Sequence, residues 1–190
     1  MLTLLRDQGL VKAGDAQRTD STHVLAAIHA LNRLELLGET LRHALNRLAV
    51  VAPEWLVSWV PPAWFERYGK QISNYRLPAR QAERTRLAEQ IGTDGRTLLT
   101  MVHSAPAPPW AREAPGVETL KQVWQQQYQD VLPTEPMRLR PAKDLAPASE
   151  LICSPYDPEA RYRRKRDTEW VGYAVQCDSF ARNQPALAGG

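Results

Sequence analysis

Apolar side chains recur every three or four residues between positions 24 and 48. This spacing places them on one stripe and predicts a long amphipathic helix. A glycine inside a helix costs about 1 kcal/mol relative to alanine, so we expect the helix to bend or break at Gly38. Arg33, Glu39 and Arg42 fall off the stripe and are expected to face solvent. The stripe consists of Val24, Ile28, Leu31, Leu34, Leu37, Leu41, Leu45 and Leu48.

Two later segments show the same periodicity. Residues 80–103 predict a second helix, interrupted between Gly92 and Gly95, and residues 117–128 predict a third, short amphipathic helix. Between the first two helices, tryptophans alternate with prolines over residues 53–65, which predicts short helices or turns whose rings anchor a core. The chain is rich in leucine and alanine, and this also favours helix over strand.

The remaining segments have other patterns. Six prolines between residues 132 and 158 predict an extended connector. Residues 168–176 alternate and are rich in aromatic and β-branched side chains, which predicts a strand, and residues 17–24 predict another short strand. Residues 176–190 lack periodicity and end in Gly-Gly, so we expect a disordered tail.

The composition narrows the class of protein. Of the 190 residues, 43% are hydrophobic and 24% are charged, and the mean hydropathy is −0.46. No apolar stretch approaches the ~20 residues of a membrane span, which excludes an integral membrane protein. The start of the chain lacks the features of a secretory leader, and two cysteines, Cys153 and Cys177, cannot build a disulfide framework. We therefore expect a cytoplasmic protein with free, inert thiols.

The positive charge is concentrated in one hexapeptide. The net charge is +3, and residues 161–166, RYRRKR, hold five of the 24 basic side chains, so the rest of the chain carries −2. Clustered guanidinium groups contact phosphate oxygens without reading sequence, and five contacts give weak, salt-dependent binding. The alternative is a solvated charged loop. The candidate DNA-binding residues are Arg161, Arg163, Arg164, Lys165 and Arg166.

Asp20 is the acidic residue best placed for metal chemistry. It lies in the predicted first strand, directly before the leucine-rich helix, so its carboxylate would lie at the boundary between two elements. Enzymes that cut phosphodiesters with two metal ions hold the ions with two or three such carboxylates. The alternative is that Asp20, Ser21 or Thr22 caps the helix, and spacing alone favours the cap.

Several longer segments together carry a family resemblance. With them the chain resembles the DDE transposases of bacterial insertion sequences, over about residues 2 to 173. The segments are RTDSTHV (18–24), LAAIHALNRLE (25–35), ETLRHALN (39–46), VVAPEWL (50–56), WFERYG (64–69), YRLP (75–78), AEQIGTDG (88–95), VETLKQVW (117–124), SPYDPEARY (154–162) and KRDTEWVGY (165–173).

The resemblance implies an α/β but helix-dominated fold, a partial RNase H-like core with a large helical insertion between the first strand and a later strand. It also implies a division of the chain. The expected parts are a remnant of an upstream helical region (1–14), a partial catalytic domain (15–175) and an off-pattern tail (176–190). Within the catalytic domain they are a first strand (15–24), the helical insertion (25–131), a Pro-rich connector (132–160) and a basic loop and strand (161–175).

The resemblance also implies a reaction. Asp20 matches the first acid of the DDE triad, a ligand for the Mg²⁺ ions that activate water and then a DNA 3′-hydroxyl. In the family, the other two acids follow the Gly-Tyr strand, but this chain departs from the pattern after Tyr173. One carboxylate cannot hold two cations against their hydration, and we do not expect Asp157, Glu159 or Asp178 to replace the missing acids.

These inferences lead to three hypotheses about function. The first is a truncated DDE transposase that is inactive alone, with DNA as its partner and no membrane. The second is a non-catalytic module that binds DNA or associates with full-length transposase and interferes with it. The third is a remnant without a role.

Overall fold

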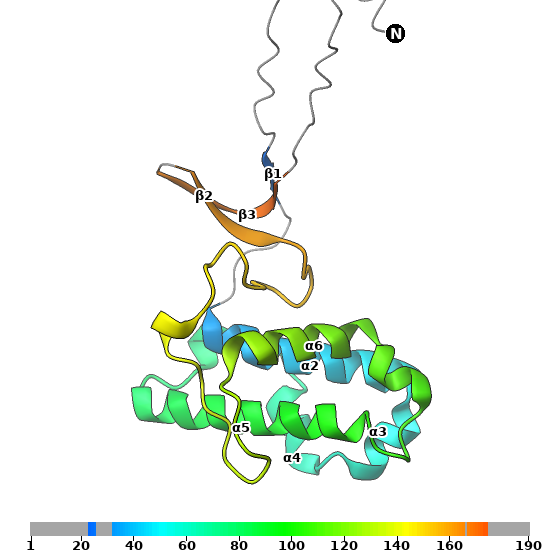
Figure 1. Ribbon diagram of the computed structural model, residues 1–190. Coiled ribbons are helices and arrows are strands. Elements are labelled where there is room, and N and C mark those ends of the chain that lie inside the picture. The colour runs from blue at the N-terminus through cyan, green and yellow to red at the C-terminus, as the bar shows by residue number, and fades with distance from the viewer. Residues whose placement is uncertain (1–22, 26–31, 166, 175–190) are drawn as a thin grey trace, which may run out of the picture. The chain divides into compact units, whose positions relative to one another are not determined.

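The computed structural model describes residues 23–25, 32–165 and 167–174. Asp20, Arg166, and the predicted parts 1–14 and 176–190 lie outside these residues. The chain divides into two units, Leu25–Tyr173 and a second unit made of Met1–Val24 and Ala174–Gly190. Five α-helices are described (Figure 1), so the prediction of a helix-dominated chain is confirmed. They are α2 (Arg33–Val51), α3 (Pro53–Trp59), α4 (Pro62–Tyr68), α5 (Gln81–Met101) and α6 (Pro115–Gln127).

The start of α2 is set by Asn32 rather than by a residue near position 20. The Asn32 side chain accepts hydrogen bonds from the backbone N–H groups of Leu34 and Glu35, each 3.1 Å long. The Glu35 carboxylate accepts in return from the Asn32 backbone N–H, at 3.2 Å, which completes a capping box. The prediction that this helix already includes Val24 is wrong, because Val24 lies in the short strand β1 (His23–Leu25).

Both predicted helix breaks are absent. The helix α2 continues through Gly38, and α5 continues through Gly92 and Gly95. At Gly95 a Cβ atom would lie 2.2 Å from the Trp124 ring, and at Gly92 it would lie 2.5 Å from the Tyr128 ring. These two glycines therefore allow α6 to pack closely on α5, and their helix-propensity cost of about 1 kcal/mol each is offset by that packing.

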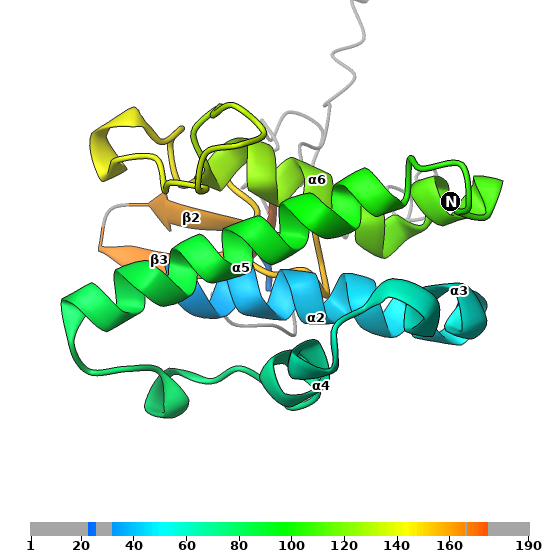
Figure 2. The ribbon, with the colours of Figure 1, turned by 90° about the horizontal axis from the view of Figure 1, so that it is seen from below.

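The core lies between α2, α5 and α6, which run side by side (Figures 1 and 2). Each helix turns its apolar stripe inward, as the periodicity predicts. Two ring atoms of α6 also bond to the backbone of α5: Trp124 Nε1 donates to the Gly92 carbonyl at 3.0 Å, and the Tyr128 hydroxyl donates to the Ala88 carbonyl at 2.7 Å. The fully buried core residues include Leu37, Leu41, Leu48, Ile91, Leu98, Leu120 and Val123.

The tryptophan-rich stretch forms α3 and α4, two helices of seven residues that each begin with proline. Their rings pack in sequence: Trp55 on Trp59, Trp59 on Trp64, and Trp64 on Tyr68, with centroids 5.4 to 5.9 Å apart. Trp64 and Tyr68 are buried. The prediction that these rings pack in short helices against a core is confirmed.

The Pro-rich segment contains one 3₁₀ turn, Ala142–Asp144, and is otherwise extended, as predicted. It is nevertheless anchored, because Met137 and Ile152 are buried in the core. After it, β2 (Arg161–Lys165) and β3 (Thr168–Ala174) form an antiparallel hairpin. The strand prediction for residues 168–176 is confirmed over β3, but the predicted basic loop is wrong, since residues 161–165 are a strand. Over the described ranges, no helix is long and apolar enough to span a membrane.

Candidate nucleic-acid interface

The basic hexapeptide occupies the first strand of the β2–β3 hairpin. The register pairs Arg161 with Gly172, Arg163 with Trp170, and Arg164 with Glu169. Successive side chains of a strand point to opposite faces, so Arg161 and Arg163 share one face and Arg164 lies on the other. The strand therefore divides the predicted DNA-binding residues between two faces. Lys165 ends β2 opposite Thr168.

Two of these arginines already have partners within the protein. Arg161 donates from Nη1 to the carbonyl oxygens of Pro158 and Ala160, the second at 3.1 Å. Arg164 Nε lies 3.7 Å from the Glu169 carboxylate, and both side chains are at least half exposed. A hydrogen bond to the same carboxylate raises the pKa of Tyr162. Arg161 is thus engaged in holding the preceding turn, whereas Arg164 can exchange its partner for a phosphate.

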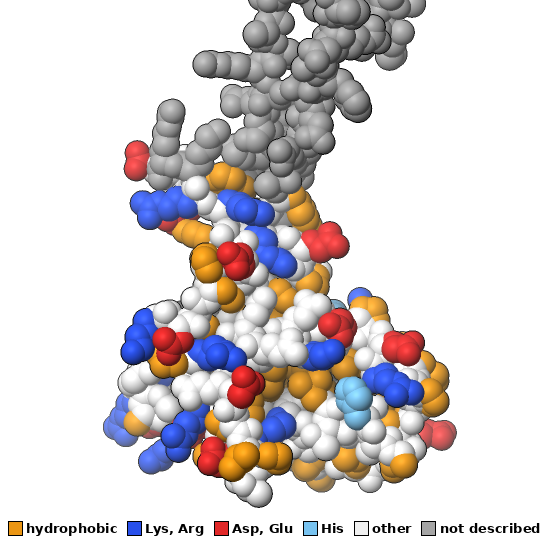
Figure 3. Space-filling view, viewed as in Figure 1, with side chains coloured by type: hydrophobic (Ala, Val, Ile, Leu, Met, Phe, Trp, Pro, Cys, Tyr) orange, Lys and Arg blue, Asp and Glu red, His pale blue; other side chains and the backbone are white. Residues whose placement is uncertain are grey.

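Arg163 differs from its neighbours. Its Nε atom is buried and makes no hydrogen bond to any described residue. A buried donor without an acceptor costs about 1–3 kcal/mol, so an acceptor that reached Arg163 would recover that energy. Figure 3 shows basic side chains on the hairpin with acidic ones beside them. Residues 161–174 hold five basic and two acidic side chains, so the hairpin has a net charge of +3.

The acids near the hairpin have structural roles. Asp157 accepts hydrogen bonds from the Ala160 N–H at 3.2 Å and from the Tyr173 hydroxyl. In the part of the chain that is described, no group of three or more His, Cys, Asp or Glu side chains could hold a metal ion. Asp178, like Asp20, lies outside that part. The described residues therefore supply no site for Mg²⁺.

A buried carboxylate that the sequence reading placed in solvent lies at the centre of α2. Glu39 is 1% exposed. Its oxygens accept two hydrogen bonds from Arg42, each 2.9 Å long, one of 2.6 Å from the Ile72 N–H, and one from the Tyr156 hydroxyl. Burial alone would raise the pKa of Glu39, but these hydrogen bonds outweigh it, and the net pKa is lowered from 4.5.

Glu39 therefore joins α2 to two distant segments, one around Ile72 and one around Tyr156. The prediction that it faces solvent is wrong, because the helix is covered on that side as well. An acid and a base three residues apart, Glu39 and Arg42, are common on exposed helices, so the sequence holds no clear signal of burial.

A second buried carboxylate lies on α5. Asp94 is 5% exposed and accepts from the Arg67 guanidinium, from the Tyr68 hydroxyl at 2.6 Å, and from Gln90 Nε2 at 2.9 Å. Burial, and then the hydrogen bond to Asp94, raises the pKa of Tyr68. All members of the network are paired, so the arrangement ties α4 to α5 and offers no free acid or base for catalysis.

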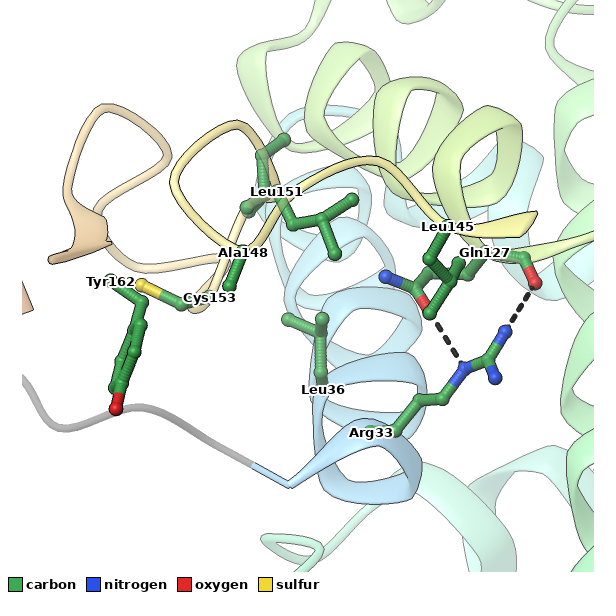
Figure 4. A pocket seen from close by; sticks show the side chains of 9 residues that line it. Arg33, Leu36, Gln127, Leu145, Ala148, Leu151, Cys153 and Tyr162 are labelled. Atoms are coloured by element: carbon green, nitrogen blue, oxygen red, sulfur yellow. Dashed lines mark hydrogen bonds between the residues drawn. The ribbon is translucent and has the colours of Figure 1, made fainter. Parts of the chain in front are cut away.

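The hollow in Figure 4 is a third candidate site. It has a volume of about 310 Å³ and is lined mainly by apolar side chains, including Leu36 and Leu151. At one end Arg33 donates to Gln127 Oε1 at 2.8 Å and to two backbone carbonyls, so its donors are engaged. Burial raises the pKa of the Cys153 thiol, which agrees with the expected inert thiol.

Taken together, the described residues offer a basic hairpin and two closed ionic networks, and the hairpin is the arrangement most open to a ligand. Comparisons with models of protein families, with curated proteins and with solved structures found no match for the chain. The argument about function therefore depends on the residues of the chain itself and on the segments quoted above.

Proposed function

We propose that this chain is part of a DDE-type transposase that binds DNA through the β2–β3 hairpin and does not catalyse strand transfer alone. The observation that carries the proposal is the hairpin itself: five basic residues on six consecutive positions, held in a strand and opposed by only two acids. The resemblance of its flanking segments to DDE transposases supplies the enzyme family. The hairpin supplies the physical means of binding.

The expected binding is electrostatic. Arg161 is engaged with backbone carbonyls, so Arg163, Arg164, Lys165 and Arg166 remain for phosphate contacts. Each contact with duplex DNA changes the slope of log K against log salt by about −0.9, so four contacts give a slope of roughly −3 to −4. Contacts to phosphates position a protein but carry no sequence information. We therefore expect weak binding without sequence preference.

The proposal includes an incomplete metal site. By resemblance, Asp20 is the first acid of a DDE triad on the first strand of an RNase H-like core, and β3 resumes the sheet. When bound by a complete triad, Mg²⁺ activates the attacking oxygen and stabilises the leaving oxygen. Mg²⁺ gives up its waters reluctantly, so Asp20 alone is not expected to hold it in a productive place.

A double variant of the hairpin tests the binding. Fluorescence anisotropy with labelled duplex DNA is measured for the wild type and for Arg163→Gln/Arg164→Gln over a range of salt. We expect weaker binding and a slope reduced by about 2. The matched control, Arg47→Gln/Arg138→Gln, removes the same charge from exposed positions elsewhere. Equal losses in both variants would show general attraction and contradict a hairpin site.

A nicking assay tests the catalytic part. The purified chain is incubated with supercoiled DNA and Mg²⁺ or Mn²⁺, and we expect no nicked or joined product. Product formation that disappears in Asp20→Ala would overturn the proposal that the chain is inactive alone.

A second candidate function is interference with intact transposase without catalysis. The observation in its favour is that β2, within the described residues, pairs with a neighbour on one edge only. An unpaired strand edge can add to the sheet of another chain. Co-purification of the chain with intact transposase, and reduced strand transfer in the mixture, would favour this candidate over a simple DNA-binding fragment.

A further inference from the structure

A second basic region lies in the helical part, far from the hairpin in sequence. Residues 70–86, which we term the arginine segment, hold five basic side chains and one acid, Glu83, a net charge of +4. The sequence reading did not single it out, because its charges are spread over 17 positions instead of six. Its basic residues are Lys70, Arg76, Arg80, Arg84 and Arg86.

The arginine segment carries a strongly exposed aromatic ring. Tyr75 is 82% exposed, more than any other large hydrophobic side chain described except for near equality with Val50, at 81%. Its backbone is fixed, because it lies in the 3₁₀ turn Asn74–Arg76 between two anchors, Ile72 and Leu77, which pack on the core. The Ile72 N–H also donates to the buried Glu39 carboxylate. The ring is therefore held in solvent by a structured turn.

Arg76 lies over this ring, with its guanidinium carbon 5.5 Å from the ring centroid. A guanidinium plane beside an aromatic face is a combination on which nucleic-acid bases stack. In the interior such a pair would stabilise the fold, but here the tyrosine is exposed and contributes little to the core. Its exposure leaves the ring open to a ligand.

The other arginines extend the positive charge from this ring along the start of α5. The Arg80 side chain is 85% exposed and lies 3.6 Å from Glu83, an ion pair that solvent makes weak. Arg86 is exposed, and Arg84 lines a hollow of about 300 Å³ together with Asn32 and Gln81. Figure 3 shows basic side chains gathered in this part of the helical region.

We propose that the arginine segment is a binding site for single-stranded DNA. One unpaired base stacks on Tyr75 beside Arg76, and the adjoining phosphates lie along Arg80, Arg84 and Arg86. A stacking ring favours a single strand, because the bases of a duplex already stack on one another. This site goes beyond the proposed function of the hairpin and does not depend on it.

The experiment measures anisotropy of a labelled short oligothymidylate with the full chain. Tyr75→Ala removes the stacking ring, and we expect the affinity to fall by about tenfold, within the range measured for base stacking on aromatic rings. Tyr75→Phe keeps the ring and is expected to bind like the wild type. Tyr75 is exposed, so all variants are expected to fold, and their thermal unfolding verifies this.

Charge variants complete the test. Arg76→Gln/Arg80→Gln/Arg86→Gln is expected to reduce the salt slope for the single strand by roughly 2. The control Arg47→Gln/Arg112→Gln/Arg138→Gln removes the same charge elsewhere. Unchanged affinity in Tyr75→Ala, or an equal loss in the control, would overturn the proposal, as would a preference for duplex over single strand. The hairpin variant Arg163→Gln/Arg164→Gln is expected to keep the Tyr75 effect, which separates failure of this site from failure of the hairpin.

Discussion

The helical part and the hairpin use the same pair of chemical groups in opposite ways. Glu39 and Asp94 are buried, and each is held by an arginine and a tyrosine. Glu169 on the hairpin also faces an arginine, Arg164, but the two side chains are 50% and 67% exposed. Removal of one partner from a buried pair leaves an uncompensated charge, whereas an exposed pair is worth little. Burial therefore decides which of these carboxylates supports the fold.

The largest expected effect is at Glu39. We expect Glu39→Ala to lower the free energy of unfolding by about 3 kcal/mol, because Arg42 and the Ile72 N–H lose their acceptor. Urea denaturation followed by circular dichroism measures the change. A loss no larger than that of Glu169→Ala, the exposed counterpart, would show that burial does not separate the two regions.

The packing of α5 on α6 gives the next effect. Gly95→Ala is expected to cost about 2 kcal/mol, since its Cβ would overlap the ring of Trp124, which is 4% exposed and has no room to move. Gly38→Ala is the control, because its Cβ meets the flexible end of Ile72, at 2.3 Å, and the gain in helix propensity offsets part of the cost. Equal costs at the two positions would contradict the proposed role of Gly95.

A smaller effect is the dependence of stability on pH. The pKa of Glu39 is lowered in the folded chain, so its contribution is fully present above the unfolded value of 4.5. This contribution is lost as the pH falls through the lower, folded pKa. We expect Glu39→Gln to show a shallower fall in unfolding free energy below pH 4.5 than the wild type. Parallel pH profiles would show that Glu39 titrates normally.

The smallest effect on stability is expected on the hairpin. Glu169→Gln should change the unfolding free energy by less than about 0.5 kcal/mol, because the ion pair is exposed. The same substitution raises the net charge of residues 161–174 from +3 to +4 and frees Arg164, so duplex DNA should bind more tightly at low salt. Weaker binding would mean that Glu169 positions Arg164 for the phosphate.

The sequence predicted the elements better than it predicted their ends and their buried charges. Periodic leucines identified α2, and the alternation after Thr168 identified β3, because both patterns arise from one apolar face. The helix breaks at Gly38 and Gly92 were wrong, since a glycine that breaks a helix and one that admits a neighbouring ring look alike in sequence. The neighbour, Tyr128, lies 36 positions away and becomes visible only in three dimensions.

The candidate site shows the same limit. The hexapeptide was recognisable because its charges are consecutive, but its strand conformation was missed, since Arg and Lys are not strong strand formers. The arginine segment was missed because its charges are dispersed and because the exposure of Tyr75 depends on how Ile72 and Leu77 pack. Local clusters can be found in a sequence, whereas surfaces built from dispersed residues need the fold.

The capping box at the start of α2 has a practical consequence. Asn32 and Glu35 satisfy the first turn with atoms from four consecutive residues, so this helix needs nothing upstream in order to begin. A shortened polypeptide that starts at Asn32 would keep its own initiation signal and all three long helices. It would offer a tractable minimal specimen for crystallisation and for isotope labelling.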